Sequence, residues 1–325
     1  MPAPKTSRTT PHHGQDQPRK APIDRPLSVL GGRVTWTLTR AVRVNISPAD
    51  QEHTGSPPGR GASGYSGIGA ASGLPVHVAF EVTCRGTPDP TTWYVRDIKE
   101  IDRAVENAVI PLLTRQVSAN RVDRLSATAI LARCAREIDR ELAGGVWSVR
   151  WRVTPYHSYE MTPSGQPATQ DQAPAHADAG SASGFVVLRQ RFDFAASHRL
   201  HNPALSDREN LARFGKCNNP AGHGHNYVVE PAVRVQLRND HSTGFTFDDL
   251  DEITSRTIIR RFDHTHLNAD TPEFSDRGGV LPTVENIARV CYDLLSPRIA
   301  ERDHLASLVS ITVWETDRTS STYPG

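Results

Sequence analysis

The sequence predicts an α+β fold built as two lobes in tandem, each an antiparallel sheet with two helices on one face. Two observations lead to this prediction. Apolar residues first alternate in short segments and then recur at helical spacing. This order occurs once before and once after residues 160–184, a stretch dominated by Pro, Ala, Gly, Ser and Gln. With 325 residues, the chain is long enough to form two hydrophobic cores.

In the first lobe, two strands, two helices and a last strand are expected in turn at Trp36–Ile46, Val76–Arg85, Ile98–Leu112, Ala127–Leu142 and Trp147–Pro155. A Gly- and Ser-rich tract at residues 53–73 separates the first two strands. In the second lobe the same order is expected at Phe185–Phe194, Asn226–Leu237, a helix with Asp248 as its N-cap, a helix from Thr283 to Pro297, and Leu308–Trp314. In each lobe an Asp, Asp97 or Asp248, follows an aromatic strand end, which favours an internal duplication.

These patterns divide the chain into four segments. Residues 1–26 are basic and rich in Pro, Thr and His, without the apolar run of a secretory signal, so a disordered leader is expected. Residues 27–159 form the first lobe, and residues 160–184 are expected to be a flexible linker. Residues 185–325 form the second lobe.

Composition limits the partners and the compartment. Thirty-seven basic and thirty-six acidic residues give a net charge of +1, so no overall field attracts nucleic acid or a membrane surface. No apolar run reaches membrane-spanning length. The four cysteines are widely spaced and form no Cys-x-x-Cys motif, which indicates reduced thiols and a cytoplasmic protein.

A metal site is predicted from three histidines of the second lobe. His223 and His225 are two residues apart, so in a strand both project from one face. His198 follows an alternating run that is expected to be the neighbouring strand. Three imidazoles and one open coordination position are typical of catalytic zinc. Cys217, six positions before His223, leaves two interpretations open: a fourth ligand of a closed structural site, or a group that acts on a substrate.

Several motifs of the second lobe resemble the 6-pyruvoyltetrahydropterin synthase family, in order and with the expected spacing, from Phe185 to Tyr323. They are Phe194–Leu200, Leu205–Asn210, Phe214–Lys216, Cys217–Tyr227, Phe262–Asn268, Thr283–Asn286 and Trp314–Asp317. The resemblance implies the tunnelling fold, with element order β-β-α-α-β-β, a Zn²⁺ ion and the substrate 7,8-dihydroneopterin triphosphate. The 6-carboxytetrahydropterin synthases of queuosine biosynthesis share all three.

The resemblance also implies roles for individual residues. The zinc ligands would be His198, His223 and His225. Cys217 would be the general base, and Asp263 with His264 would form a proton relay. Glu315 would anchor the pterin ring, and Thr283 and Glu285 would help to line its pocket. Without the family, Glu315 would be read as one half of a salt bridge, and His266 as a residue at a helix end or in a loop.

Three functions follow, of which a pyruvoyl-forming lyase is preferred. Five residues separate Cys217 from His223, and this longer arm resembles the pyruvoyl-forming type. The first alternative is the carboxy-forming relative, and the second is a non-catalytic pterin- or metal-binding module.

The first lobe resembles a degenerate copy without zinc ligands, because Leu112-Leu113-Thr114 stands where the second lobe has Phe262-Asp263-His264. Members of the family assemble as rings with active sites at subunit borders, so a homo-oligomer is expected, in which the first lobe could take the place of a neighbour.

Overall fold

The computed structural model describes residues 35–46, 76–118, 125–163, 184–275 and 278–324. The predicted leader, the Gly- and Ser-rich tract and most of the predicted linker lie outside the described residues. Ten strands form one sheet that is antiparallel except for one short parallel pair. The predicted α+β class, an antiparallel sheet with helices on one face, is therefore confirmed. No helix in the described ranges has the length and apolar character needed to cross a membrane.

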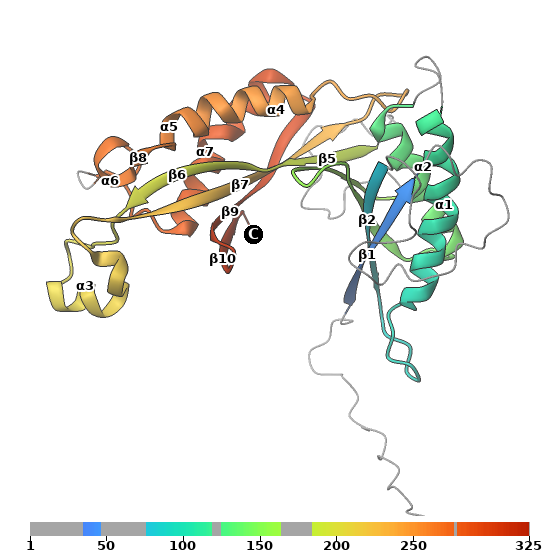
Figure 1. Cartoon of the computed structure of the whole chain (residues 1–325), viewed down its shortest axis with the longest axis horizontal. Helices are drawn as coiled ribbons and strands as arrows, with labels where there is room; N and C mark the ends of the chain where they lie inside the picture. Colours follow the sequence, from blue (N-terminus) through green and yellow to red (C-terminus); the bar gives the residue numbers. More distant parts are fainter. Residues whose placement is uncertain (1–34, 47–75, 119–124, 164–183, 276–277, 325) are drawn as a thin grey trace, which may run out of the picture. The chain divides into compact units, whose positions relative to one another are not determined.

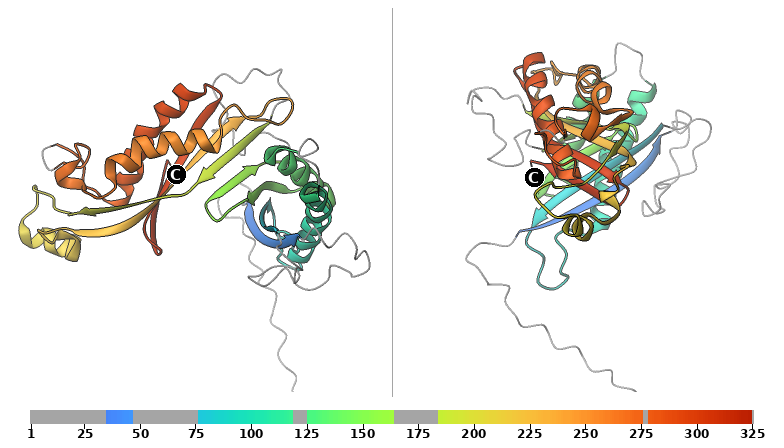
Figure 2. Two further views of the ribbon diagram at one scale, coloured as in Figure 1. Left: turned by 45° about the horizontal axis from the view of Figure 1, so that its top comes forward. Right: turned by 90° about the vertical axis from the view of Figure 1, so that its left-hand side faces the viewer.

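The described residues of the first lobe form four strands in the order β1-β2-β3-β4 and two helices (Figure 1). Its elements are β1 (Trp36–Ile46), β2 (Val76–Gly86), α1 (Ile98–Ser118), α2 (Ala127–Glu141), β3 (Val146–Arg152) and β4 (His157–Met161). Figure 2 shows α1 and α2 against the same side of the strands. Alternation produces this packing, because every second residue of β2 from Val78 to Cys84 is buried beneath the helices.

The second lobe repeats this plan with insertions at its ends. Its elements are β5 (Phe185–Gln190), β6 (Phe192–His198), α3 (Asp207–Phe214), η4 (Gly215–Asn218), β7 (His223–Gln236), α4 (Phe247–Thr254), η5 (Ser255–Ile259), α5 (Arg260–Phe262), β8 (Thr265–His266), α6 (Leu267–Asp270), α7 (Val284–Arg302), β9 (Ala306–Thr316) and β10 (Thr319–Tyr323). Strand β7 pairs with β5 and β6 along one side and with β9 along the other. Helices α4 and α7 lie over one face of these strands (Figure 1).

Several predicted boundaries of the second lobe were wrong. The first strand breaks at Arg191 and continues to His198, and β7 begins at His223 rather than at Asn226. The N-cap of α4 is Thr246, whose side chain accepts a hydrogen bond from Asp249, so Asp248 lies within the helix. Helix α7 continues through Pro297 to Arg302. Burial of its apolar side chains on both sides of the proline outweighs the lost hydrogen bond.

The two lobes meet through a strand pair that was not predicted. Strand β4 pairs antiparallel with β5, with Glu160 opposite Val187. Glu160 and Met161, predicted to belong to the linker, are therefore part of the sheet. Residues 164–183 lie outside the described part. If β5 and β6 are counted as one interrupted strand and the two-residue β8 is left aside, both lobes have the order of two strands, two main helices and two strands that a duplication would produce. The predicted equivalence of Asp97 with Asp248 changes, however. Asp97 immediately precedes α1, and the residue that immediately precedes α4 is Thr246.

Candidate metal centre

Strands β6 and β7 bring three histidines together on the face that the helices cover. His198 lies opposite His223, and Ala196 lies opposite His225, so all three imidazoles project to the same side. One ring nitrogen from each histidine lies within 4.8 Å of the others. Within the described residues this is the one group of at least three His, Cys, Asp or Glu side chains that could hold a metal ion.

The protonation of His198 is set by its buried surroundings. Its Nδ1 lies 2.7 Å from the carbonyl oxygen of Pro282, which precedes α7, and a carbonyl can only accept. Nδ1 therefore carries the proton, and Nε2 presents a lone pair to the other histidines. Burial lowers the pKa of His198 to about 4, although the Pro282 carbonyl favours the charged form. His198 is therefore a neutral ligand at physiological pH.

The surrounding donor atoms fit a zinc ion. The Nε2 atoms of His198 and His223 are 3.1 Å apart, near the roughly 3.3 Å that separates two nitrogen ligands of tetrahedral zinc. Nε2 of His225 is buried and has no hydrogen-bond partner among the described residues. Glu315 Oε1 lies 3.5 Å from His198 Nε2 and 3.6 Å from His225 Nε2. A cation bound here would satisfy the unpaired Nε2 of His225 and face a carboxylate.

Cys217 lies beside this cluster in η4, the 3₁₀ turn that leads into β7. Its carbonyl accepts a hydrogen bond from the backbone of Leu200, which joins the turn to the end of β6. Burial and then the Glu315 carboxylate raise the pKa of the Cys217 thiol. The metal-free surroundings therefore favour the thiol, and only a cation nearby would favour the thiolate. The group of three histidines does not include the sulfur, which argues against a closed four-ligand site.

Gly222 and His266 support the start of β7. Gly222 has φ +70°, and a Cβ atom there would meet Nε2 of His266 at 2.9 Å and the carbonyl oxygen of His198 at 3.0 Å. Only glycine fits this conformation and this close approach. The imidazole of His266, expected to be an ordinary helix-end or loop residue, thus packs beside the strand that carries the metal-binding histidines. Its proximity in the sequence to Asp263 and His264 gave no indication of this contact.

Asp263 and His264 lie beside the edge of β6 that pairs with β8. Asp263 Oδ1 accepts from the Ala195 N–H at 2.9 Å, and Oδ2 lies 2.9 Å from His264 Nδ1. The Ala195 hydrogen bond and then the His264 ring lower the pKa of Asp263. The His264 side chain is 83% exposed and lines a shallow cavity of about 480 Å³ with Ala195, His225 and Asn226. Within the described part of the chain, no hydrogen bond or ion pair joins this pair to the three histidines.

The other predicted pocket residues differ in position. Thr283 is the N-cap of α7 and follows Pro282, so it lies next to the carbonyl that holds His198. Glu285 is in the first turn of the same helix and is exposed. Tyr227, for which no role was predicted, is fully buried with its hydroxyl 3.4 Å from His198 Nδ1. The structure thus gathers Thr283 and Glu315 around the cluster, and leaves Glu285 on the helix surface.

Comparison with known proteins identifies relatives of the second lobe. The family model described as 6-pyruvoyl tetrahydropterin synthase matches residues 187–325. The human 6-pyruvoyl tetrahydrobiopterin synthase is 40% identical over 140 residues, which are 42% of this chain and 90% of the human protein. The Drosophila melanogaster protein of the same name is 38% identical over 142 residues, 43% of this chain and 80% of that protein. A solved 6-pyruvoyl tetrahydropterin synthase from Caenorhabditis elegans is 32% identical, with a TM-score of 0.39, and covers 43% of this chain and 96% of that one.

Proposed function

The chain belongs to the 6-pyruvoyl tetrahydropterin synthase family, and on this premise we propose that its second lobe is a zinc-dependent carbon–oxygen lyase. The substrate would be 7,8-dihydroneopterin triphosphate, and the product a 6-substituted tetrahydropterin formed with loss of triphosphate. The observation that supports this proposal most is the cluster of His198, His223 and His225 beside Glu315. We propose a cytoplasmic location, since all four cysteines are free.

The residues around the cluster supply the remaining chemistry. His198, His223 and His225 would hold the zinc ion, which when bound polarises the hydroxyl oxygens of the substrate side chain and makes the neighbouring protons more acidic. Cys217 would remove such a proton as the thiolate. Glu315 would accept hydrogen bonds from the amino and ring N–H groups of the pterin. Thr283, at the start of α7, would line the pterin pocket, and Glu285 would contribute at its rim.

The position of His264 supports a homo-oligomer with active sites at its borders. Asp263 would hold the imidazole of His264 for proton transfer, yet among the described residues no hydrogen bond or ion pair joins this pair to the three histidines of its own chain. The exposed His264 is available to a second copy of the chain. We therefore propose that the proton relay of one copy completes the metal centre of another. The first lobe, whose α1 continues through Leu112 and Leu113 to Ser118 without a turn like that at Asp263, would contribute packing rather than chemistry.

The experiment is to incubate the purified chain with 7,8-dihydroneopterin triphosphate and identify the pterin by mass. The five residues between Cys217 and His223 favour the 6-pyruvoyl product. A 6-carboxy product with acetaldehyde would instead identify the carboxy-forming type. Untouched substrate together with bound pterin would identify a non-catalytic binding module. Metal analysis of the same sample should give close to one zinc per chain, and two would contradict a metal-free first lobe.

A further inference from the structure

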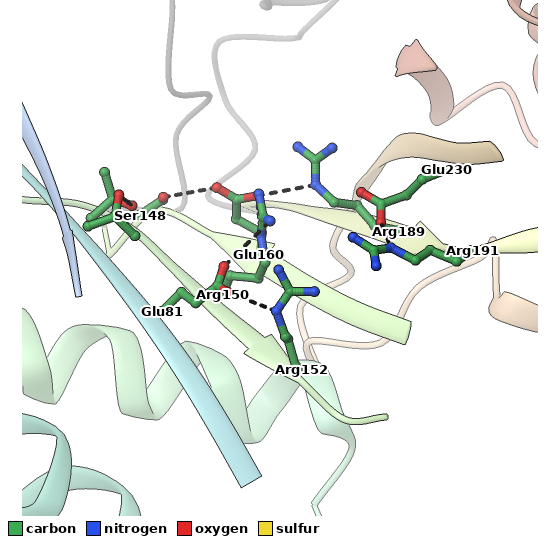
Figure 3. A network of polar contacts seen from close by, with 10 residues as sticks. Glu81, Ser148, Arg150, Arg152, Glu160, Arg189, Arg191 and Glu230 are labelled. Atoms are coloured by element: carbon green, nitrogen blue, oxygen red, sulfur yellow. Dashed lines mark hydrogen bonds and ion pairs between the residues drawn. The ribbon is translucent and has the colours of Figure 1, made fainter. Parts of the chain in front are cut away.

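A row of arginines crosses the junction between the two lobes on the sheet face opposite the helices. Each is held by one carboxylate through its Nε atom (Figure 3). Arg152 Nε donates to Glu81 at 2.7 Å, Arg189 Nε to Glu160 at 3.4 Å, and Arg191 Nε to Glu230 at 2.7 Å. Within the described part of the chain, the terminal nitrogens of these three arginines make no hydrogen bond. The carboxylates therefore orient each guanidinium group through its Nε edge, and the terminal nitrogens remain available to bind a ligand.

The strand register sets the spacing of this row. Arg152 of β3 lies opposite Ser158 of β4, and Ser158 lies opposite Arg189 of β5. Ser158 is small and buried, 5% exposed, so no long side chain stands between the two cationic ones. Strand spacing puts the backbones of the two arginines about 9.5 Å apart. Arg191 follows two residues after Arg189, about 6.5 Å along the chain.

The charges of this junction do not cancel. Four guanidinium groups, those of Arg150, Arg152, Arg189 and Arg191, face three carboxylates. Arg150 already binds Glu160 through two nitrogens and lies 3.5 Å from Glu81, so it shares the carboxylates of both neighbours. Burial lowers the pKa of Arg189, and the Arg150 charge adds to this effect against the attraction of Glu160. Arg189 is thus a largely buried cation whose positive charge the nearby carboxylates neutralise only in part.

We propose that Arg152, Arg189 and Arg191 bind an oligophosphate over Ser158. The N–H groups along a guanidinium edge can donate two parallel hydrogen bonds to the oxygens of a phosphate group. A chain of several phosphates can bind several arginines in a row, whereas one carboxylate cannot. This site is distinct from the metal centre, because seven residues of extended chain, about 23 Å, separate Arg191 from His198. The bound anion connects Arg152 of the first lobe to Arg189 of the second. The inference does not depend on the proposed lyase reaction.

The test is calorimetric titration of the full chain with inorganic triphosphate. The variants are Arg152→Gln and Arg189→Gln, with Arg298→Gln as the control, since Arg298 is an exposed helix residue paired with Glu301. Either junction variant leaves Arg150 to pair with Glu81 and Glu160, so the fold is expected to persist. We expect one site per chain, an affinity that falls with salt, and a loss of about tenfold or more in each junction variant but not in Arg298→Gln.

A second measurement, of the melting temperature with and without triphosphate, tests the proposal even if one junction variant folds poorly. Triphosphate should raise the melting temperature of the wild-type chain and of Arg298→Gln, and should leave that of Arg191→Gln nearly unchanged. A nucleoside triphosphate titrated in parallel distinguishes the sources: tighter binding indicates a nucleotide, and equal binding indicates a free phosphate chain. Three results would overturn the proposal: no binding by the wild-type chain, equal affinity in all variants, or equal binding of sulfate.

Discussion

The carbonyl oxygen of Pro282 determines how His198 can bind a metal. By accepting the Nδ1 proton at 2.7 Å, it leaves Nε2 as the free donor toward His223 and His225. The metal site thus depends on the loop before α7, which is 84 residues away from His198 in the sequence. A side-chain substitution cannot remove this carbonyl, so the residue-scale predictions concern the neighbours of the cluster.

Replacing Cys217 with Ala should keep the metal and abolish turnover. The sulfur is outside the group of histidine nitrogens, so zinc content should stay close to that of the wild-type chain. Loss of a general base typically lowers the rate by 10²–10⁴-fold, roughly. Metal analysis and product formation measured on one preparation check both parts. Loss of zinc from the variant would instead favour the structural four-ligand site.

Replacing Gly222 with Ala should destabilise the fold by about 1–3 kcal/mol and weaken zinc binding. The added Cβ would lie 2.9 Å from the His266 ring and 3.0 Å from the His198 carbonyl, so the start of β7 must move. Gly144→Ala is the matched control, because Gly144 also has a positive φ, +90°, but nothing within 4 Å of its Cβ position. Denaturant unfolding and zinc titration of both variants separate crowding from backbone strain; equal zinc affinities would contradict the crowding argument.

Sequence predicted that the three histidines lie close together, but not the contacts that support them. The two-residue spacing of His223 and His225 determined their common face, and the alternation before His198 indicated its strand. The support from Pro282 is a backbone contact, which no side-chain pattern encodes. Likewise, a sequence cannot show where Asp263 and His264 lie relative to the cluster, because that depends on how β8 joins β6.

At the scale of elements, the β4–β5 pair is held by charge as well as by backbone hydrogen bonds. Glu160 of β4 pairs with Arg150 of β3 and Arg189 of β5, and its side chain is only 19% exposed. Burial alone would raise the pKa of Glu160, but Arg150 and Arg189 outweigh it, so the pKa is lowered from 4.5. The carboxylate therefore stabilises the junction above pH 4.5, and this stabilisation is lost as the pH falls through the lowered pKa.

Replacing Glu160 with Gln should test this pH dependence. At pH 7 the variant should lose roughly 2 kcal/mol of unfolding free energy, because two arginines lose a charged partner. The difference from wild type should shrink as the pH falls below 4.5 and through the lowered pKa of Glu160. Glu301→Gln, which removes an exposed helix carboxylate, is the control and should change little at any pH. A difference for Glu160→Gln that is constant from pH 7 to pH 3 would contradict the assignment.

The elements that sequence missed are those decided by contacts between distant segments. Strand β4 has only five residues, and it is a strand because β3 and β5 pair with both of its edges. Helix α7 passes Pro297 because its neighbours β9 and β10 pack along it. By contrast, β1 and the start of β2 matched their predicted ends, because alternation alone defines them.

At the scale of the whole molecule, one sheet should couple the stabilities of the two lobes. Four of the five tryptophans, Trp36, Trp93, Trp147 and Trp151, lie in the first lobe, so Trp314→Phe yields a chain whose tryptophan fluorescence reports that lobe alone. Zinc at about 100 times its Kd should raise the melting temperature seen by this signal by roughly 5 °C, although the zinc ligands are in the second lobe.

Adding His225→Ala to the Trp314→Phe chain provides the control, since this variant lacks one predicted zinc ligand and the shift should disappear. A first-lobe transition that ignores zinc in the Trp314→Phe chain, while circular dichroism shows that the second lobe is stabilised, would mean that the lobes unfold separately despite the β4–β5 pair.

The covalent union of a metal-binding lobe with one whose described residues form no such cluster fixes their stoichiometry. Whatever number of chains associates, both kinds of lobe are present in equal amounts, and no mixture of separately made subunits can alter the ratio. A complex of these chains would thus hold half as many of the described histidine clusters as one of equal size made only from the second lobe. Expression levels cannot change this ratio, because both lobes belong to one polypeptide chain.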